Sequence, residues 1–203
     1  MASLFFSFLL SVSFLDLPPQ NDSNKPIQFS QGWTSGFVVL ETNDTIACSL
    51  RFNQMVSEGL LQVLDGNNVL TLSVKDVKAF LFFDSTKGRY RTFLTLSVPL
   101  ENAIIREIFM EYVYGNEIVS ILNHKSVGFA HSYMEFSPLK QATPLNRQYL
   151  LDSATGQLLP LSKGNALSLL DQKQKVSSFI QTNGLRFRKV SDYVKVFEYH
   201  QSL

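Results

Sequence analysis

The chain has 203 residues, a formal net charge of +1, 45% hydrophobic residues and 17% charged residues. This length suits one domain with a sizeable core, and two full domains are not expected. The composition disfavours a disordered chain, and a charge near zero gives no general attraction to nucleic acid or to anionic lipid. Seventeen phenylalanines among many β-branched residues indicate β-structure.

The N-terminal residues predict an export signal. Residues 4–15 are apolar apart from serines, and this run is too short to cross a bilayer as a helix. No Lys or Arg precedes the run, so a hydrophobic first strand is the alternative interpretation. We expect residues 1–20 to be a signal peptide and residues 21–31 to be a polar, proline-containing linker. The mature protein is then periplasmic or secreted, with no transmembrane segment after signal cleavage.

Residues 32–160 predict an antiparallel β domain. Runs of β-branched and aromatic residues alternate here with short sequences that favour hairpin turns. The expected turns lie at residues 42–44, 65–68, 85–88 and 153–156. We expect about eight to ten strands, folded as successive hairpins into a β-sandwich or an open barrel.

Residues 101–122 fit two patterns. Ile104, Ile108 and Tyr112 lie on one stripe at helical spacing. The β-branched and aromatic content favours strands instead, and Gly115-Asn116 before another apolar run favours a turn. We predict a hairpin, with a helix as the alternative.

Residues 161–203 predict helices packed on the β domain. From Asn165 the apolar residues recur at helical spacing, with Asn165 as N-cap and Gly184 as C-terminal stop. A second, shorter helix is expected to begin at Ser191, with Asp192 facing the helix dipole. The predicted fold class is therefore α+β, mainly β: an antiparallel β-sandwich or open barrel with a C-terminal helical segment.

Patterns typical of catalysis and metal binding are sparse. The histidines, His124, His131 and His200, form no close pair of metal ligands. Cys48 lies inside an apparent strand and is interpreted as a small buried hydrophobe rather than a nucleophile. No catalytic residue, no cofactor and no metal ligand is assigned.

Basic residues between positions 74 and 96 raise the question of nucleic-acid binding. The segment KGRYRTFLTL has Arg89 where the RNA-recognition strand motif needs an aromatic residue. Two arginines and a lysine at the end of a hairpin are more often solvated charges, or charges that protect a strand edge from pairing with other chains, than a binding patch. No nucleic-acid partner is expected.

Carboxylates offer an enzymatic alternative. Glu107 and Glu111 share one face of a predicted strand, with Phe109 between them. Together with Asp76 they are the candidate acids for a hydrolase acting on envelope polymers. Such glutamates more often lie on a solvated face, so the hydrolase is the second hypothesis.

Four segments carry a resemblance to known proteins: GWTSGFVVLETNDTIACSLRF, VKDVKAFLFFD, EYVYGNEIVSIL and LLPLSKGNALSLLDQKQKVSSFIQTN. Their order resembles an uncharacterised family of small exported envelope proteins of Gram-negative bacteria. The chain departs from that family in lacking basic residues before the apolar run and in ending HQSL. The resemblance implies export and a β-then-α order, and it implies no reaction.

These observations favour a non-catalytic envelope or secreted protein that binds a protein or glycan partner. The alternatives are the envelope-polymer hydrolase and a carrier of a small hydrophobic ligand, which would use an unfilled barrel interior. The sequence leaves the oligomeric state open.

Overall fold

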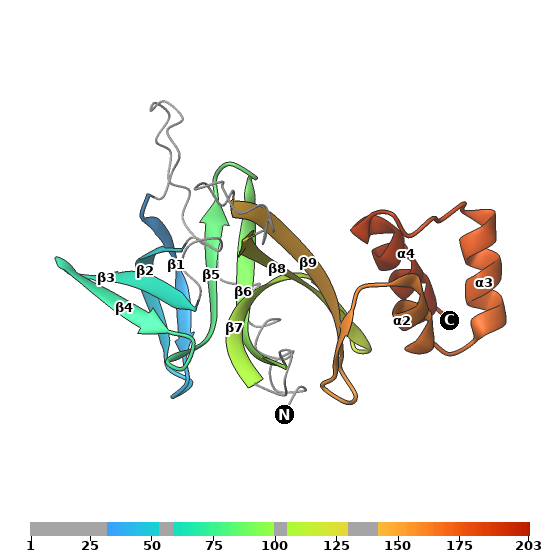
Figure 1. Cartoon of the computed structure of the whole chain (residues 1–203), viewed down its shortest axis with the longest axis horizontal. Coiled ribbons are helices and arrows are strands. Elements are labelled where there is room, and N and C mark those ends of the chain that lie inside the picture. The colour runs from blue at the N-terminus through green and yellow to red at the C-terminus, as the bar shows by residue number, and fades with distance from the viewer. Residues whose placement is uncertain (1–31, 53–58, 100–104, 130–141) are drawn as a thin grey trace, which may run out of the picture.

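A computed structural model describes residues 32–52, 59–99, 105–129 and 142–203. The predicted signal peptide and linker, residues 1–31, lie outside the described residues. Within the described part, the chain forms strands first and helices last, as Figure 1 shows.

The described residues form one sheet of ten antiparallel strands followed by three helices, which confirms the predicted fold class. The strand order is β10-β9-β8-β7-β6-β5-β1-β2-β3-β4, and the sheet is not closed. The elements are β1 (Thr34–Leu40), β2 (Thr45–Arg51), β3 (Leu60–Asp65), β4 (Asn68–Ser73), β5 (Val77–Asp84), β6 (Arg89–Pro99), β7 (Ile105–Gly115), β8 (Val119–Phe129), β9 (Ala142–Asp152), β10 (Leu158–Pro160), α2 (Lys163–Ser168), α3 (Lys173–Thr182) and α4 (Val190–Gln201).

Turns join the strands at the four predicted positions. Asn43, Gly66, Gly88 and Gly156 have positive φ at these turns, a conformation that glycine and asparagine tolerate best. Residues that tolerate positive φ therefore determine where the chain reverses direction in each of these hairpins.

Residues 105–129 form the predicted hairpin, for which a helix was the alternative. β7 and β8 pair from Glu111↔Asn123 to Gly115↔Ser120, with a register shift between Tyr112 and Tyr114. The Asn116 side chain closes the turn by accepting hydrogen bonds from two backbone N–H groups that follow it. The helical interpretation of this region is wrong.

A short connection forces the sheet to curl. In a flat sheet, β4 and β5 would lie four strand spacings apart, about 19 Å, and would run parallel. The chain from Ser73 to Val77 spans at most about 14 Å. The sheet therefore twists and curls between β5 and β4, and Figure 1 shows β3 and β4 running across the direction of β5. The backbone bond from Glu41 N–H to the Asp76 carbonyl ties this corner to β1.

Phenylalanines fill the inside of the curl. Direct cross-strand pairing places Val38, Phe80, Phe93, Glu111 and Asn123 on one side of the sheet, which we call the Phe93 face. The apolar cluster on this face contains Val38, Leu50, Leu61, Val63, Val77, Phe80, Phe82, Phe93 and Phe109. The rings of this cluster, and that of Phe52 packed against it, meet edge-to-face or stacked at centroid separations of 4.8–6.4 Å. These geometries add to the stabilisation from burial.

Two further clusters complete the core. The opposite side of the sheet, which we call the Met110 face, buries Ala79, Leu94, Val98, Met110 and Leu122. A third cluster joins the helices to the sheet. Its sheet members are Val119, Ile121 and Leu150, and its helical-segment members are Ala166, Leu170, Val176, Ile180, Tyr193, Val196 and Phe197.

The helical segment contains two helices where one was predicted to run from Asn165 to Gly184. Ser162, not Asn165, is the N-cap of α2, because its side chain accepts the Asn165 N–H. The chain then breaks at residues 169–172, where Gln172 adopts a left-handed conformation before α3. Gly184 does stop α3, with positive φ.

α4 begins one residue earlier than predicted, at Val190, and its N-cap Lys189 makes no side-chain capping bond. Asp192 lies in the first turn, as predicted, and its carboxylate accepts the Arg188 N–H. Val196 and Phe197 are fully buried. The predicted start of this helix differs from the observed one by one residue.

The close approach of β1 to β5 leads to a stability prediction. A Cβ at Gly36 would collide with the Leu81 carbonyl oxygen and approach Leu50. We expect Gly36→Ala to lower the free energy of unfolding by about 1–3 kcal/mol, as overpacking does. Urea denaturation measures the change. Gly32→Ala is the control, because a Cβ there meets nothing within 4 Å; equal losses in the two variants would contradict the proposed collision.

Candidate functional site

Arg91 and Glu111 form a buried ion pair on the Phe93 face. Arg91 Nε donates to Glu111 Oε1 at 2.8 Å, and Arg91 Nη2 donates to Glu111 Oε2 at 3.0 Å. The Glu111 side chain is 3% exposed and the Arg91 side chain 14% exposed. The Arg91 guanidinium also lies 4.9 Å from the centre of the Phe93 ring and 5.7 Å from that of Phe82. The aromatic core thus supports the cation that holds the carboxylate.

Asp84 extends this ion pair toward the β5–β6 turn. Its carboxylate lies 3.4 Å from Arg91 Nη1 and accepts hydrogen bonds from the Thr86 and Lys87 N–H groups. Burial alone would raise the pKa of Asp84, but the bonds from Thr86 and Lys87 and the charge of Arg91 bring it below its ordinary value. We call Arg91, Glu111 and Asp84 the Arg91 cluster.

Cations surround the Arg91 cluster. Arg89 Nη2 lies 3.4 Å from Glu111 Oε1. Burial and then the charge of Arg91 lower the pKa of Lys87, and Lys125 contributes in the same direction. For Glu111, burial acts to raise the pKa, but the hydrogen bonds and charge of Arg91 outweigh it, and the pKa lies below its ordinary value. Glu111 is therefore an ionised structural carboxylate.

The three candidate acids do not converge. Glu107 lies half-buried on β7 opposite Ser97 and four positions before Glu111, about 13 Å away along the backbone. Glycosidases hold their two carboxyl groups about 5–9.5 Å apart. Asp76 lies exposed in the β4–β5 turn, where it accepts bonds from the Ser73 N–H and hydroxyl. The negative charge of Glu111 is compensated by Arg91. This arrangement therefore does not bring an acid and a base together.

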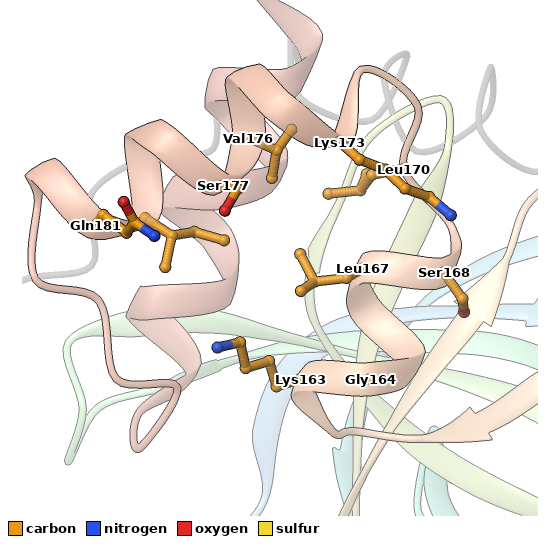
Figure 2. Close-up of a pocket in the computed structure, with 10 residues that line it drawn as sticks. Lys163, Gly164, Leu167, Ser168, Leu170, Lys173, Val176, Ser177 and Gln181 are labelled. Atoms are coloured by element: carbon orange, nitrogen blue, oxygen red, sulfur yellow. The ribbon is translucent and has the colours of Figure 1, made fainter.

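A groove lies between α2 and α3 (Figure 2). It has a volume of about 470 Å³. Leu167, Leu170, Val176 and Ile180 contribute apolar side chains. Figure 2 shows Lys163 and Gln181 toward one end of the groove and Lys173 and Ser168 toward the other. The groove therefore combines an apolar floor with a polar, cationic rim.

Interactions outside the groove hold its walls in place. Asp171, in the chain break between α2 and α3, donates its N–H to His200 Nε2 of α4 at 3.2 Å. The rings of Phe179 and Tyr199 stack at 4.0 Å and join α3 to α4. The first contact ties the α2–α3 connection to α4 and the second ties α3 to α4. α4 in turn packs on the sheet through the third apolar cluster. The groove is thus a built feature of the fold.

The helical segment is the basic part of the chain. Residues 161–203 contain seven Lys and Arg against three Asp and Glu, a formal charge of +4. The described residues between 32 and 160 contain nine of each and are neutral. No acidic side chain lines the groove, whereas Lys163 and Lys173 both do. The net charge of +1 conceals this asymmetry, and a charge count by segment would have revealed it.

The cysteine and the histidines do not form a catalytic or metal site in the described residues. Cys48 is half-buried on β2 opposite Gly36, and burial raises the pKa of its thiol, which disfavours the reactive thiolate. His124 and His200 are half-buried, and His131 lies outside the described residues. In the described segments, no three His, Cys, Asp or Glu side chains are grouped as a metal site. None of the helices described here has the length and apolar character to span a membrane.

Comparison with protein-family models, with curated proteins and with solved structures finds no match to the chain. The resemblance to exported envelope proteins stays a prediction.

The Arg91–Glu111 pair gives a stability prediction. Glu111→Gln keeps the size of the side chain but leaves the buried guanidinium without its full counter-charge. Breaking a buried pair in this way is expected to lower the free energy of unfolding by about 3 kcal/mol at neutral pH. Chemical denaturation measures this loss. Glu107→Gln, on the same face of β7, is the control and should change stability by less than about 0.5 kcal/mol.

The pair also has a pH signature. Since the folded pKa of Glu111 lies below its ordinary value of 4.5, its stabilising contribution is present above that value. The contribution is lost as the pH falls through the folded pKa. The difference in stability between the native chain and Glu111→Gln should therefore shrink in acid. A difference that stays constant as the pH falls would show that Glu111 is not held as a carboxylate.

Proposed function

We propose that the protein is a non-catalytic binding module that holds a segment of a partner protein in the groove between α2 and α3. The observation that carries this proposal is the groove itself, an open apolar floor between two cationic ends on an anchored helical hairpin. Helix pairs with such grooves bind apolar side chains of a partner segment and leave its polar side in water.

Charge selects the class of segment. Lys163 and Lys173 are exposed at the rim, and the surrounding helical segment carries a formal charge of +4. A partner segment with acidic residues flanking an apolar stretch complements both features. Basic segments are repelled by the same charge. The proposed ligand is therefore an acidic, amphipathic segment of a protein.

A protein partner fits this groove better than a glycan does. Sugars pack their rings against aromatic side chains, and the groove is lined by Leu, Val, Ile, Ser, Gln, Gly and Lys. A carrier function would need an enclosed interior, whereas the sheet formed by the described strands is not closed. These points favour protein binding over the other ligand classes.

We also propose that this binding takes place outside the cytoplasm, in the periplasm or after secretion. The support is the apolar run at residues 4–15, which has the length of the apolar core of a signal peptide. Fractionation of the native host with N-terminal sequencing tests this. Recovery of a shortened chain from the envelope or medium is expected, and a cytoplasmic chain that retains Met1 would contradict export.

Photo-crosslinking tests the groove directly. A photoreactive amino acid at Ser177 faces the groove, whereas the same group at Ser178 is exposed on the next residue of α3 and does not line it. In the native host, Ser177 should give a specific protein adduct and Ser178 should not. Equal adducts at both positions, or none at either, would contradict a partner in the groove.

Charge reversal tests the chemistry of the partner captured in this way. Lys173→Glu should weaken binding of that partner by about tenfold or more, because it places a like charge beside acidic residues. Lys175→Glu is the matched control, since Lys175 is exposed on the same helix and does not line the groove. Isothermal titration calorimetry compares the two. Equal losses would indicate general electrostatics rather than the groove.

A further inference from the structure

β4 forms one edge of the sheet in the described part of the chain, and its own residues carry none of the usual protection of an edge. It pairs with β3 over six residues and stands at the end of the strand order. Its sequence, NVLTLS, contains no charged residue and no proline. Natural sheet edges are normally blunted by charges, prolines or bulges, because an open edge pairs with other strands.

The opposite edge of the sheet differs. β10 has three residues, the last of them Pro160. The Pro160 carbonyl accepts a hydrogen bond from the Asn165 side chain at 2.8 Å. This edge is short, lacks one N–H and has a carbonyl already bonded, so it is a poor template for pairing. Among the strands that the structure describes, β4 therefore offers the better edge for pairing with another strand.

The phase of the β3–β4 ladder shows which backbone groups face outward. In a two-residue hairpin, the pair next to the turn exchanges both backbone hydrogen bonds, and every second pair does the same. Asp65↔Asn68 is that pair, so the N–H and C=O groups of Val69 and Thr71 point away from β3. Two bonds agree with this phase: Val74 N–H donates to the Gly59 carbonyl, and Ser73 N–H donates to the Asp76 carboxylate.

Side chains on β4 are also exposed. Val69 is 51% exposed and Leu70 is 45% exposed, and they lie on opposite sides of the sheet. In Figure 1 the turn of the β3–β4 hairpin points away from the body, at the end of the molecule opposite the helices. An uncharged strand with apolar residues on both sides is therefore accessible.

We infer that the outer edge of β4 pairs with β4 of a second copy of this chain, antiparallel across a two-fold axis at Leu70. Asp76 occupies the outward N–H of Ser73, which leaves Val69 and Thr71 as the free positions. Pairing Val69 of one copy with Thr71 of the other gives hydrogen-bond partners to the outward N–H and C=O groups of both residues. The arrangement opposes two β-branched residues on one side and two Leu70 side chains on the other, and both are favourable cross-strand pairs.

A second copy fits this edge better than an unrelated peptide does. β4 itself has no charged side chain to attract a partner of defined sign, and the Asp76 carboxylate lies at Ser73, away from the paired positions Val69 and Thr71. Two copies of this strand therefore pair without repulsion between their own side chains. The paired surface is restricted to one short strand from each copy and is smaller than the roughly 1,200 Å² of a stable complex. The expected dimer is consequently weak and forms reversibly in the micromolar to millimolar range. This inference does not depend on the proposed partner in the groove.

Sedimentation equilibrium of the purified full chain over this concentration range tests the pairing. Val69→Lys and Thr71→Glu should each weaken the dimer by about tenfold, because each brings two like charges beside the axis. The double variant should regain affinity, since the introduced lysine of each copy then faces the introduced glutamate of the other. This recovery depends on the register and not on apolar association elsewhere in the chain.

Two further variants separate pairing from misfolding. Thr71→Pro removes an outward N–H that β3 does not use, so it should abolish the dimer while circular dichroism stays native. Ile46→Lys is the control, because Ile46 is an exposed aliphatic residue on β2, away from the edge; it should leave the dimer unchanged. A chain that stays monomeric at millimolar concentration overturns the inference. So does a dimer whose dissociation constant is unchanged by the β4 substitutions.

Discussion

The three-residue connection from β4 to β5 is the constraint on which the rest of the structure depends. It requires the end of β4 and the start of β5 to meet, although three strands separate them in the sheet. The sheet satisfies this only by curling over the Phe93 face, which encloses the phenylalanine cluster. The same curl turns the β3–β4 hairpin away from the body and leaves its edge open. A longer connection would remove this geometric requirement.

The Arg91 cluster lies on the same side of the sheet as two apolar clusters. Phe93, Glu111 and Asn123 are direct neighbours across β6, β7 and β8, while the helices pack on Ile121 and Leu150 further along. Polar groups in this position have to be satisfied by one another, because burying them unpaired is costly. A buried pair of this kind does little for net stability; we expect it instead to oppose alternative registers of β6 and β7, in which Arg91 and Glu111 would not meet.

Much of the fold follows from local sequence, and the site does not. Residues that tolerate positive φ mark the hairpin turns, and alternation marks the strands between them. The β1–β5 pairing could not be predicted in this way, because it joins strands that are distant in sequence. The break at Gln172 was missed because the apolar spacing of α2 and α3 runs on in phase across it. The groove depends on that break. Nothing in the sequence therefore indicated that Lys163 and Lys173 line one groove. Glu111 was recognised as a candidate, but its role depends on Arg91, whose position only the sheet register supplies.

The uneven distribution of charge gives this nearly neutral protein a strong electric asymmetry. The helical end carries a net charge of +4, while the described residues of the β domain carry no net charge. The two lie at opposite ends of Figure 1. In a diffusional encounter, an anionic surface therefore exerts a torque that turns the helices toward it before contact. The reach of this torque is set by the Debye length, about 8 Å at physiological ionic strength. Orientation, rather than overall attraction, is what such a molecule gains from its charges.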